Sequence, residues 1–291
     1  MRSNRRRGSS SPPNSRRSSD NNIRQSESQR PRMLSMNDRS LDDPTTIDEF
    51  ARDGYLVARD LADSQITEPM TEAILHALSP LQAPAEFEAE VGYPGSPESK
   101  GAIGGSTPRR LLHAFSRGSV FRRWARSPQV ATILRRIMDA PQIEMSQCHH
   151  NCIMTKHPGF SSETAWHQDI RYWSFDAPEL VSVWLALGPE REDNGALRVI
   201  PGSHRLHPDR GRLDKNLFLR PELDENRELI ERSKVLELHT GDALFFHCRL
   251  FHAAGRNRSD KTKISAVFTY HSADNRPIPG TRSDRYPPVP L

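Results

Sequence analysis

The spacing of apolar residues changes character about halfway along the chain. Before Ala140, apolar side chains recur with the period of an α-helix, in one stripe from Ser64 to Leu78 and in another after Ser127-Pro128. Ser is a good N-cap residue and Pro suits the first helical position, so the second of these helices has a clear start. A capping box at 46–49 predicts a shorter helix that leads into a strand at 54–57. We expect these helices to brace a sheet.

After Ala140 the chain consists of short apolar runs separated by turn signals. Asp193-Asn194-Gly195 is a strong hairpin signal, and two further turns are indicated at 201–203 and 240–242. The predicted strands are 147–156, 181–187, 197–200, 235–239, 243–247 and 264–271. Helices followed by many short strands favour a mostly β fold, a barrel or jelly roll with supporting helices, over alternating βαβ units.

Composition divides the chain into a tail and one folded domain. Residues 1–44 lack apolar periodicity and are dominated by Ser, Arg, Asn and Pro, which predicts a disordered Arg/Ser-rich tail before a domain over 45–291. The formal net charge is +4, but the first 32 residues carry nine Arg against Asp20 and Glu27. Removing this charge of +7 leaves −3 for residues 33–291, so we do not expect nucleic acid to be a partner of the folded part. The tail could still serve as an RNA- or partner-docking arm.

Cysteine usage and hydropathy bear on the compartment. Cys148, Cys152 and Cys248 are an odd number without a C-x-x-C pair, which favours a reducing compartment and a cytoplasmic location. No apolar run approaches the ~20 residues that cross a bilayer, and the basic start lacks the apolar segment of a signal peptide. We therefore expect no membrane partner, and a monomer or homodimer that acts on a small molecule.

Two histidines and an aspartate have a spacing that suits metal ligands. Trp166-His167-Gln168-Asp169 places an imidazole and a carboxylate two residues apart, on one side of an extended segment. A second imidazole follows 85 residues later at His252. Two His and one carboxylate leave three positions of a six-coordinate iron open, enough for a chelating keto acid and O₂. H-x-D alone occurs by chance in many chains, so the neighbouring sequence is needed to show whether these residues bind a metal.

Three stretches together resemble the phytanoyl-CoA dioxygenase family in order and spacing. They are HQDIRYW, DNGALRVIPGSHR and GDALFFHCRLFHAAGRNRS, and the resemblance covers roughly 45–280. It implies a double-stranded β-helix, with Fe(II), 2-oxoglutarate and O₂ used to hydroxylate an aliphatic C–H bond of a small-molecule or acyl substrate. It also implies that His167 and Asp169 are the first two metal ligands and His252 the distal one. A catalytically silent metabolite-binding barrel of the same fold is the alternative.

The resemblance also suggests a cosubstrate site. The family commonly has an Arg eleven residues after the distal His, where it grips the far carboxylate of 2-oxoglutarate, and this chain has Lys263 there. Lys supplies the charge without the two-pronged fork of Arg, and Ser265, on the same face of the predicted strand, could add a hydrogen bond. Lys156 and Trp184 are expected to line the same site. Two nearby cations could bind this carboxylate instead: Arg256 and Arg258.

Other residues compete for these roles. His247 is a rival distal ligand, but the family pattern places the ligand just before Ala-Ala-Gly, which selects His252. Cys148, His150 and Cys152 would share a strand face but fit no common zinc module, although His150 could face the substrate. The segment 101–121 could cover the pocket and attract an anion, with a solvated basic loop as the simpler interpretation. Its basic residues are Arg109, Arg110, His113 and Arg117.

Overall fold

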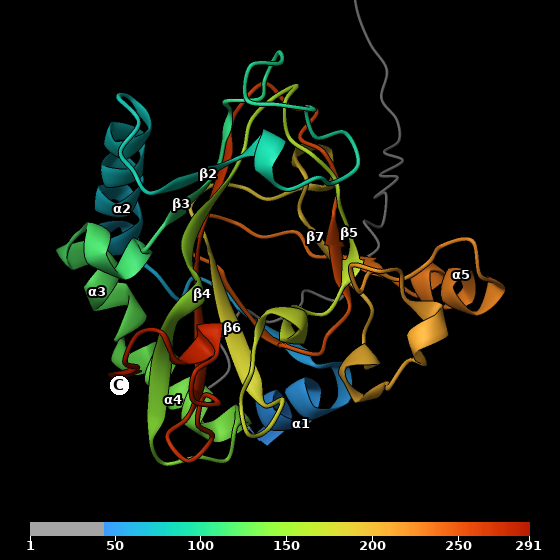
Figure 1. Ribbon diagram of the computed structural model, residues 1–291. Coiled ribbons are helices and arrows are strands. Elements are labelled where there is room, and N and C mark those ends of the chain that lie inside the picture. The colour runs from blue at the N-terminus through green and yellow to red at the C-terminus, as the bar shows by residue number, and fades with distance from the viewer. Residues whose placement is uncertain (1–43) are drawn as a thin grey trace, which may run out of the picture. The chain divides into compact units, whose positions relative to one another are not determined.

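Two antiparallel sheets form the centre of residues 44–291, which are the residues that the computed structural model describes (Figure 1). The predicted tail over 1–44 lies outside the described residues except for Pro44. The larger sheet has the order β1-β9-β6-β11-β4-β3-β2, with β12 pairing β4, and the smaller has the order β5-β10-β7-β8.

The larger sheet comprises β1 (Tyr55–Ala58), β2 (Ala85–Phe87), β3 (Pro108–Leu112), β4 (Ile143–Lys156), β6 (Leu180–Ala186), β9 (Ala243–His247), β11 (Lys263–Ser272) and β12 (Val289–Pro290). The smaller comprises β5 (Thr164–His167), β7 (Leu197–Val199), β8 (Lys234–Val235) and β10 (His252–Ala254). The helices are α1 (Pro44–Asp53), α2 (Ser64–Leu78), α3 (Ser119–Ala125), α4 (Pro128–Ile137) and α5 (Asp224–Glu231).

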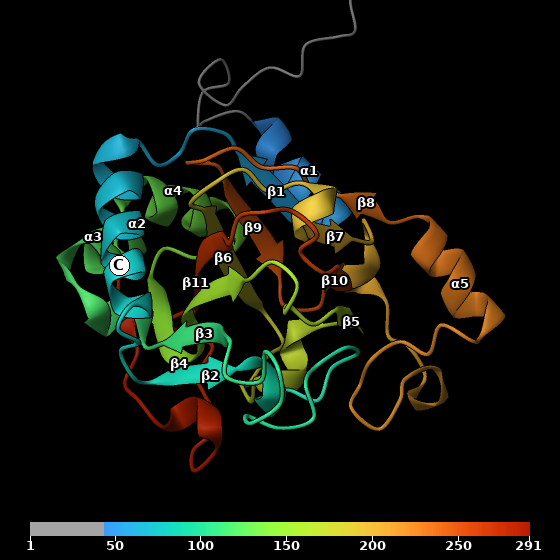
Figure 2. The same ribbon diagram turned by 90° about the horizontal axis from the view of Figure 1, so that it is seen from above.

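The central strands of the larger sheet are covered on both faces. Every residue of β6 and β9 is buried, and alternate residues of β6 join different apolar clusters. Val183 belongs to the apolar cluster that includes residues of α2, α3 and α4, whereas Trp184 belongs to the one that includes residues of β7 and β10. Figure 2 shows α2, α3 and α4 on the side of the larger sheet away from β5 and β10, with α1 beside the edge strand β1. The space between the two sheets is therefore the place for a site.

Local signals account for the helices that the sequence predicts. The helix α2 covers the predicted residues Ser64–Leu78 and buries Met70 and Ile74 from its apolar stripe. The helix α4 begins at Pro128, as predicted, and Ser127 Oγ accepts a hydrogen bond from the backbone N–H of Val130 at 3.5 Å. The helices α3 and α5 and the strands β2, β3, β5, β10 and β12 were not predicted, because each is too short to show a clear period.

One predicted hairpin is wrong. The turn at Asp193-Asn194-Gly195 is present, with Gly195 at φ 81°, but β6 before it and β7 after it belong to different sheets. A glycine that supplies positive φ suits a crossover turn as well as a hairpin. The motif therefore predicted the turn correctly but did not show that the flanking strands would pair with each other. The chain thus passes from the larger to the smaller sheet at Gly195.

A large bulge interrupts β4. Its pairing with β11 passes from Asn151↔Phe268 to Ser146↔Thr269, so residues 147–150 of β4 have no partner on β11. His149 in this bulge has a left-handed backbone, at φ 50°. Bulges re-aim side chains, and this one brings His150 to the wall of the cavity between the sheets.

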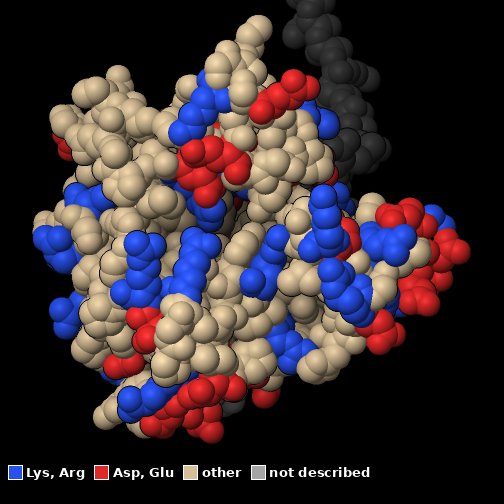
Figure 3. Space-filling model, viewed as in Figure 1, with Lys and Arg blue, Asp and Glu red and all other residues tan. Residues whose placement is uncertain are grey.

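Two surface properties of the described residues bear on partners. None of their helices combines the length and the apolar character that crossing a membrane requires. Basic and acidic side chains are interspersed on the face shown in Figure 3, with acidic groups gathered around α5 at the right. This mixture agrees with the charge of −3 for residues 33–291.

Candidate metal centre and cosubstrate pocket

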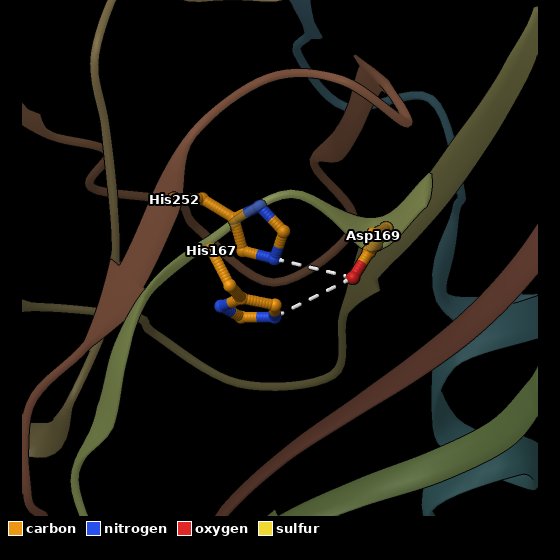
Figure 4. Close-up of side chains that lie close together, drawn as sticks. All are labelled: His167, Asp169 and His252. Carbon is orange, nitrogen blue, oxygen red and sulfur yellow. Dashed lines mark ion pairs between the residues drawn. The ribbon is translucent and has the colours of Figure 1, made fainter. Parts of the chain in front are cut away.

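The structure brings the three predicted metal ligands together. His167 is the last residue of β5, and His252, the first residue of β10, is its antiparallel partner, so the two imidazole centroids lie 4.3 Å apart. Asp169 Oδ1 lies 3.5 Å from the Nε2 atom of each histidine (Figure 4). All three side chains are buried. They form the one cluster of possible metal ligands found among the described residues.

The local backbone differs from the predicted one. The strand ends at His167, and Asp169 opens a 3-10 turn over Asp169–Tyr172, so the carboxylate does not reach the site by strand alternation. The turn carries it over the two imidazoles instead. The H-x-D spacing therefore brings His167 and Asp169 together through a strand end followed by a turn.

The donor atoms fit a divalent metal ion. His167 Nδ1 lies 2.9 Å from the carbonyl oxygen of Ala165, and His252 Nδ1 lies 3.0 Å from that of Leu250. When each Nδ1–H donates to its carbonyl, each Nε2 lone pair faces Asp169, and metal-bound histidines are commonly oriented by such a hydrogen bond from the other ring nitrogen. Both carboxylate oxygens of Asp169 are buried without a hydrogen-bond partner. A metal ion would satisfy these four atoms.

The electrostatics favour the protonation states that bind a metal. Burial alone would raise the pKa of Asp169, but His150 and His252 hold it well below its usual range. Burial lowers the pKa of His252 to about 4. Near neutral pH, Asp169 is therefore a carboxylate and His252 a neutral imidazole, which are the forms that coordinate metals.

The other residues considered as metal ligands do not belong to this cluster. His247 Nε2 lies 2.9 Å from Glu179 Oε2, and the cluster of possible ligands does not include it. Cys148 and Cys152 are buried in two different apolar clusters, so the zinc alternative has no support among the described residues. His150 lines the cavity with Nδ1 3.2 Å from Asp169 Oδ2, so it faces the candidate metal ligands.

The predicted cosubstrate residues lie around the same cavity. Lys156, Trp184 and Lys263 line it together with the three candidate metal ligands. Ser265 stands behind this wall and donates to Glu190 Oε1 at 2.6 Å. The two alternative cations for the distal carboxylate, Arg256 and Arg258, are exposed and line a different hollow.

Further residues lie in the cavity wall or directly behind it. The segment 101–121 is not simply a solvated loop, because its strand β3 carries Arg109 and Arg110 into the wall. Tyr93 and Tyr172 also line the cavity, and their hydroxyl oxygens lie 3.1 Å apart. Glu190, which is fully buried behind Lys263, was not predicted at all. A charged residue in a turn is usually solvated, so no sequence signal pointed to it.

Comparison with known proteins identifies the family. The model of the family described as Phytanoyl-CoA dioxygenase (PhyH) matches residues 50–265. The chain belongs to the phytanoyl-CoA dioxygenase family. It is 28% identical to an ectoine dioxygenase of Halomonas elongata over 261 residues, which is 83% of this chain and 74% of that protein. It is 29% identical to human peroxisomal phytanoyl-CoA dioxygenase over 136 residues, 43% of this chain and 39% of that protein.

Solved structures of similar fold extend the comparison. EctD from S. alaskensis with 2-oxoglutarate and 5-hydroxyectoine superposes with a TM-score of 0.65 at 21% identity, covering 82% of this chain and 79% of that one. The epimerase SnoN in complex with Fe³⁺, alpha ketoglutarate and nogalamycin RO gives 0.64 at 21% identity, covering 85% and 94%. The predicted family, the double-stranded β-helix fold and the class of enzyme, a dioxygenase, are confirmed.

Proposed function

We propose that this member of the phytanoyl-CoA dioxygenase family is an Fe(II)- and 2-oxoglutarate-dependent dioxygenase that hydroxylates an aliphatic C–H bond of a small-molecule or acyl substrate. The observation that carries the proposal is the convergence of His167, Asp169 and His252, with unsatisfied carboxylate oxygens, on a cavity that has lysines in its wall. Two His and one carboxylate on one face of an iron ion are typical of non-haem oxygenases.

Each group of residues has a separate task in this proposal. His167, Asp169 and His252 would hold Fe(II), while Lys156, Lys263 and Trp184, supported by Ser265, would form the cosubstrate end of the cavity. Bound iron, 2-oxoglutarate and O₂ supply the oxidising chemistry, and the protein contributes placement and exclusion of water.

The substrate side is formed by aromatic residues. Tyr93, Tyr172 and Phe246 line the cavity, and the T-shaped pair of Tyr93 and Phe218 stands beside the His167 ring. Such walls would keep bulk water from the metal centre and orient an apolar part of a substrate. A cytoplasmic monomer or homodimer stays a prediction, and the three cysteines are free and buried.

An anaerobic titration with Fe(II) and 2-oxoglutarate tests the proposal. The iron chelate should give its weak visible charge-transfer band in the unmodified protein and in the control His247→Ala, whose imidazole lies outside the ligand cluster. His252→Ala should lack the band because one of three ligands is gone. Absence of iron binding in the unmodified protein would refute the oxygenase proposal. Iron binding without 2-oxoglutarate consumption, tested over a panel of substrates, would support the silent barrel.

A further inference from the structure

Two lysines lie directly opposite each other in the cavity wall. Lys156 at the end of β4 and Lys263 at the start of β11 are partners in the antiparallel ladder. Both are buried, and both line the cavity that holds the metal-binding side chains. Like charges directly opposite each other destabilise a sheet, so each ammonium needs a counter-charge.

Glu190 is the counter-charge of Lys263. Its Oε2 lies 2.8 Å from Lys263 Nζ, and its Oε1 accepts hydrogen bonds from Trp184 Nε1 at 2.7 Å and Ser265 Oγ at 2.6 Å. All four side chains are buried. Glu190 itself is not part of the cavity wall. It therefore holds Lys263 and Trp184 from behind and balances the lysine charge.

Lys156 has no such partner. Its Nζ donates to two backbone carbonyl oxygens, that of Ser162 at 2.9 Å and that of Gly255 at 2.7 Å. No carboxylate of the described residues forms an ion pair with it, although its side chain is buried. An ammonium group has three donors, so one N–H remains for a ligand.

The other cations of the cavity wall are compensated. Arg110 Nη2 lies 2.6 Å from Glu86 Oε2, and Arg109 Nη1 lies 3.5 Å from Glu88 Oε2. Among the described cations that line the cavity, Lys156 is thus the one without a carboxylate partner.

The charges of a loaded site show which ligand would compensate Lys156. Asp169 balances one of the two charges of Fe(II) and leaves one, to which Lys156 adds a second. The 2-oxoglutarate dianion would balance both, one at each end. A keto acid without a distal carboxylate would leave the buried Lys156 charge unbalanced.

We propose that Lys156, and not Lys263, supplies the counter-charge for the distal carboxylate of 2-oxoglutarate, and that Glu190 is a positioning residue that holds Lys263 and Trp184 in the wall. The inference rests on the proposed function. It departs from the expectation that the lysine at the usual arginine position is the anchor, because that lysine already has an internal carboxylate.

Two variants distinguish the contributions of Lys156 and Lys263 to 2-oxoglutarate binding. Lys156→Met removes the uncompensated charge, whereas the double variant Lys263→Met with Glu190→Gln removes the compensated pair and leaves an amide to bind Trp184 and Ser265. Lys156→Gln, which retains a donor for the two carbonyls, serves if the Met variant does not fold. Each Fe(II)-loaded protein is titrated anaerobically with 2-oxoglutarate and with 2-oxopentanoate, which has the same chain and chelating end but no distal carboxylate.

We expect the unmodified protein to prefer 2-oxoglutarate and the Lys156 variants to lose most of that preference, roughly ten- to a hundredfold, as the loss of a charged hydrogen bond implies. The double variant should retain the preference within about threefold. The reverse ranking would overturn the inference and make Lys263 the anchor, while the visible band persists. If the unmodified protein gives no band with 2-oxoglutarate, the proposed function itself fails, and this inference fails with it.

Discussion

Burial affects two charged groups of the cavity in different ways. At Asp169 the neighbouring histidines outweigh burial, so the carboxylate stays ionised. At Lys156 burial lowers the pKa to about 7, with a smaller lowering by the facing cations Arg109 and Lys263 that Glu88 and Glu163 oppose. Without a bound anion, the ammonium of Lys156 is therefore only marginally retained at neutral pH.

The affinity for 2-oxoglutarate should depend on pH for this reason. Below pH 7 Lys156 is already protonated, so the dissociation constant should change little down to pH 6. Above pH 7 the free protein loses this proton and must take it up again to bind the dianion, so affinity should fall by up to tenfold per pH unit. Anaerobic titrations of the Fe(II)-loaded protein between pH 6 and 9 measure this, with Lys156→Met as the control.

A pH-independent dissociation constant in the unmodified protein would mean that Lys156 does not change its charge on binding. The same slope in Lys156→Met would assign the titration to another group. Only a slope that the substitution removes agrees with the role given to Lys156.

The crossover turn between β6 and β7 packs closely against Lys156. Gly195 has φ 81°, and a Cβ added there would lie 2.6 Å from the carbonyl oxygen of Gly255 and 2.8 Å from Lys156 Cδ. Gly255 supplies one of the carbonyls that bind Lys156 Nζ. A side chain at 195 would therefore displace both the lysine and its acceptor.

Gly195→Ala should lower the free energy of unfolding by roughly 1–3 kcal/mol, because the backbone is strained and the contacts must shift. It should also weaken 2-oxoglutarate binding while iron binding persists. Gly211→Ala is the matched control, since its Cβ would meet nothing within 4 Å and its φ is not positive. Urea unfolding and the chelate titration give the two readouts, and unchanged cosubstrate binding in Gly195→Ala would separate this turn from the site.

The sequence predicted those elements whose signal is local. The stripe of α2 and the apolar run of β9 gave correct boundaries, because periodicity and strand composition are properties of one segment. The partner of Lys263 could not be predicted, since Glu190 lies 73 residues away and contacts it only through the tertiary structure. The bulge at 147–150 was not predicted for a similar reason, because it is defined by the pairing of β4 with the distant strand β11.

In the described residues as a whole, the candidate site joins the two sheets. The smaller sheet and the turn after β5 provide the candidate metal ligands, whereas Lys156, Lys263 and Trp184 lie on three strands of the larger sheet. Iron alone would contact residues of the smaller sheet and its adjoining turn. A chelated 2-oxoglutarate would extend from the metal to the larger sheet and link the two.

Cosubstrate should therefore stabilise the fold beyond the effect of iron. At a concentration one hundred times its dissociation constant, a ligand that binds only the folded state adds about 2.7 kcal/mol, which corresponds to a rise of several degrees in the melting temperature of a domain of this size. Anaerobic thermal unfolding with Fe(II) alone, with 2-oxoglutarate and with 2-oxopentanoate at equal concentration measures the contribution of the distal carboxylate. His252→Ala should show no increment with either acid, because no chelate forms. Equal increments in melting temperature for the two acids in the unmodified protein would mean that the distal carboxylate does not reach the larger sheet. A larger increment for 2-oxoglutarate that Lys156→Met abolishes would show that Lys156 binds the distal carboxylate.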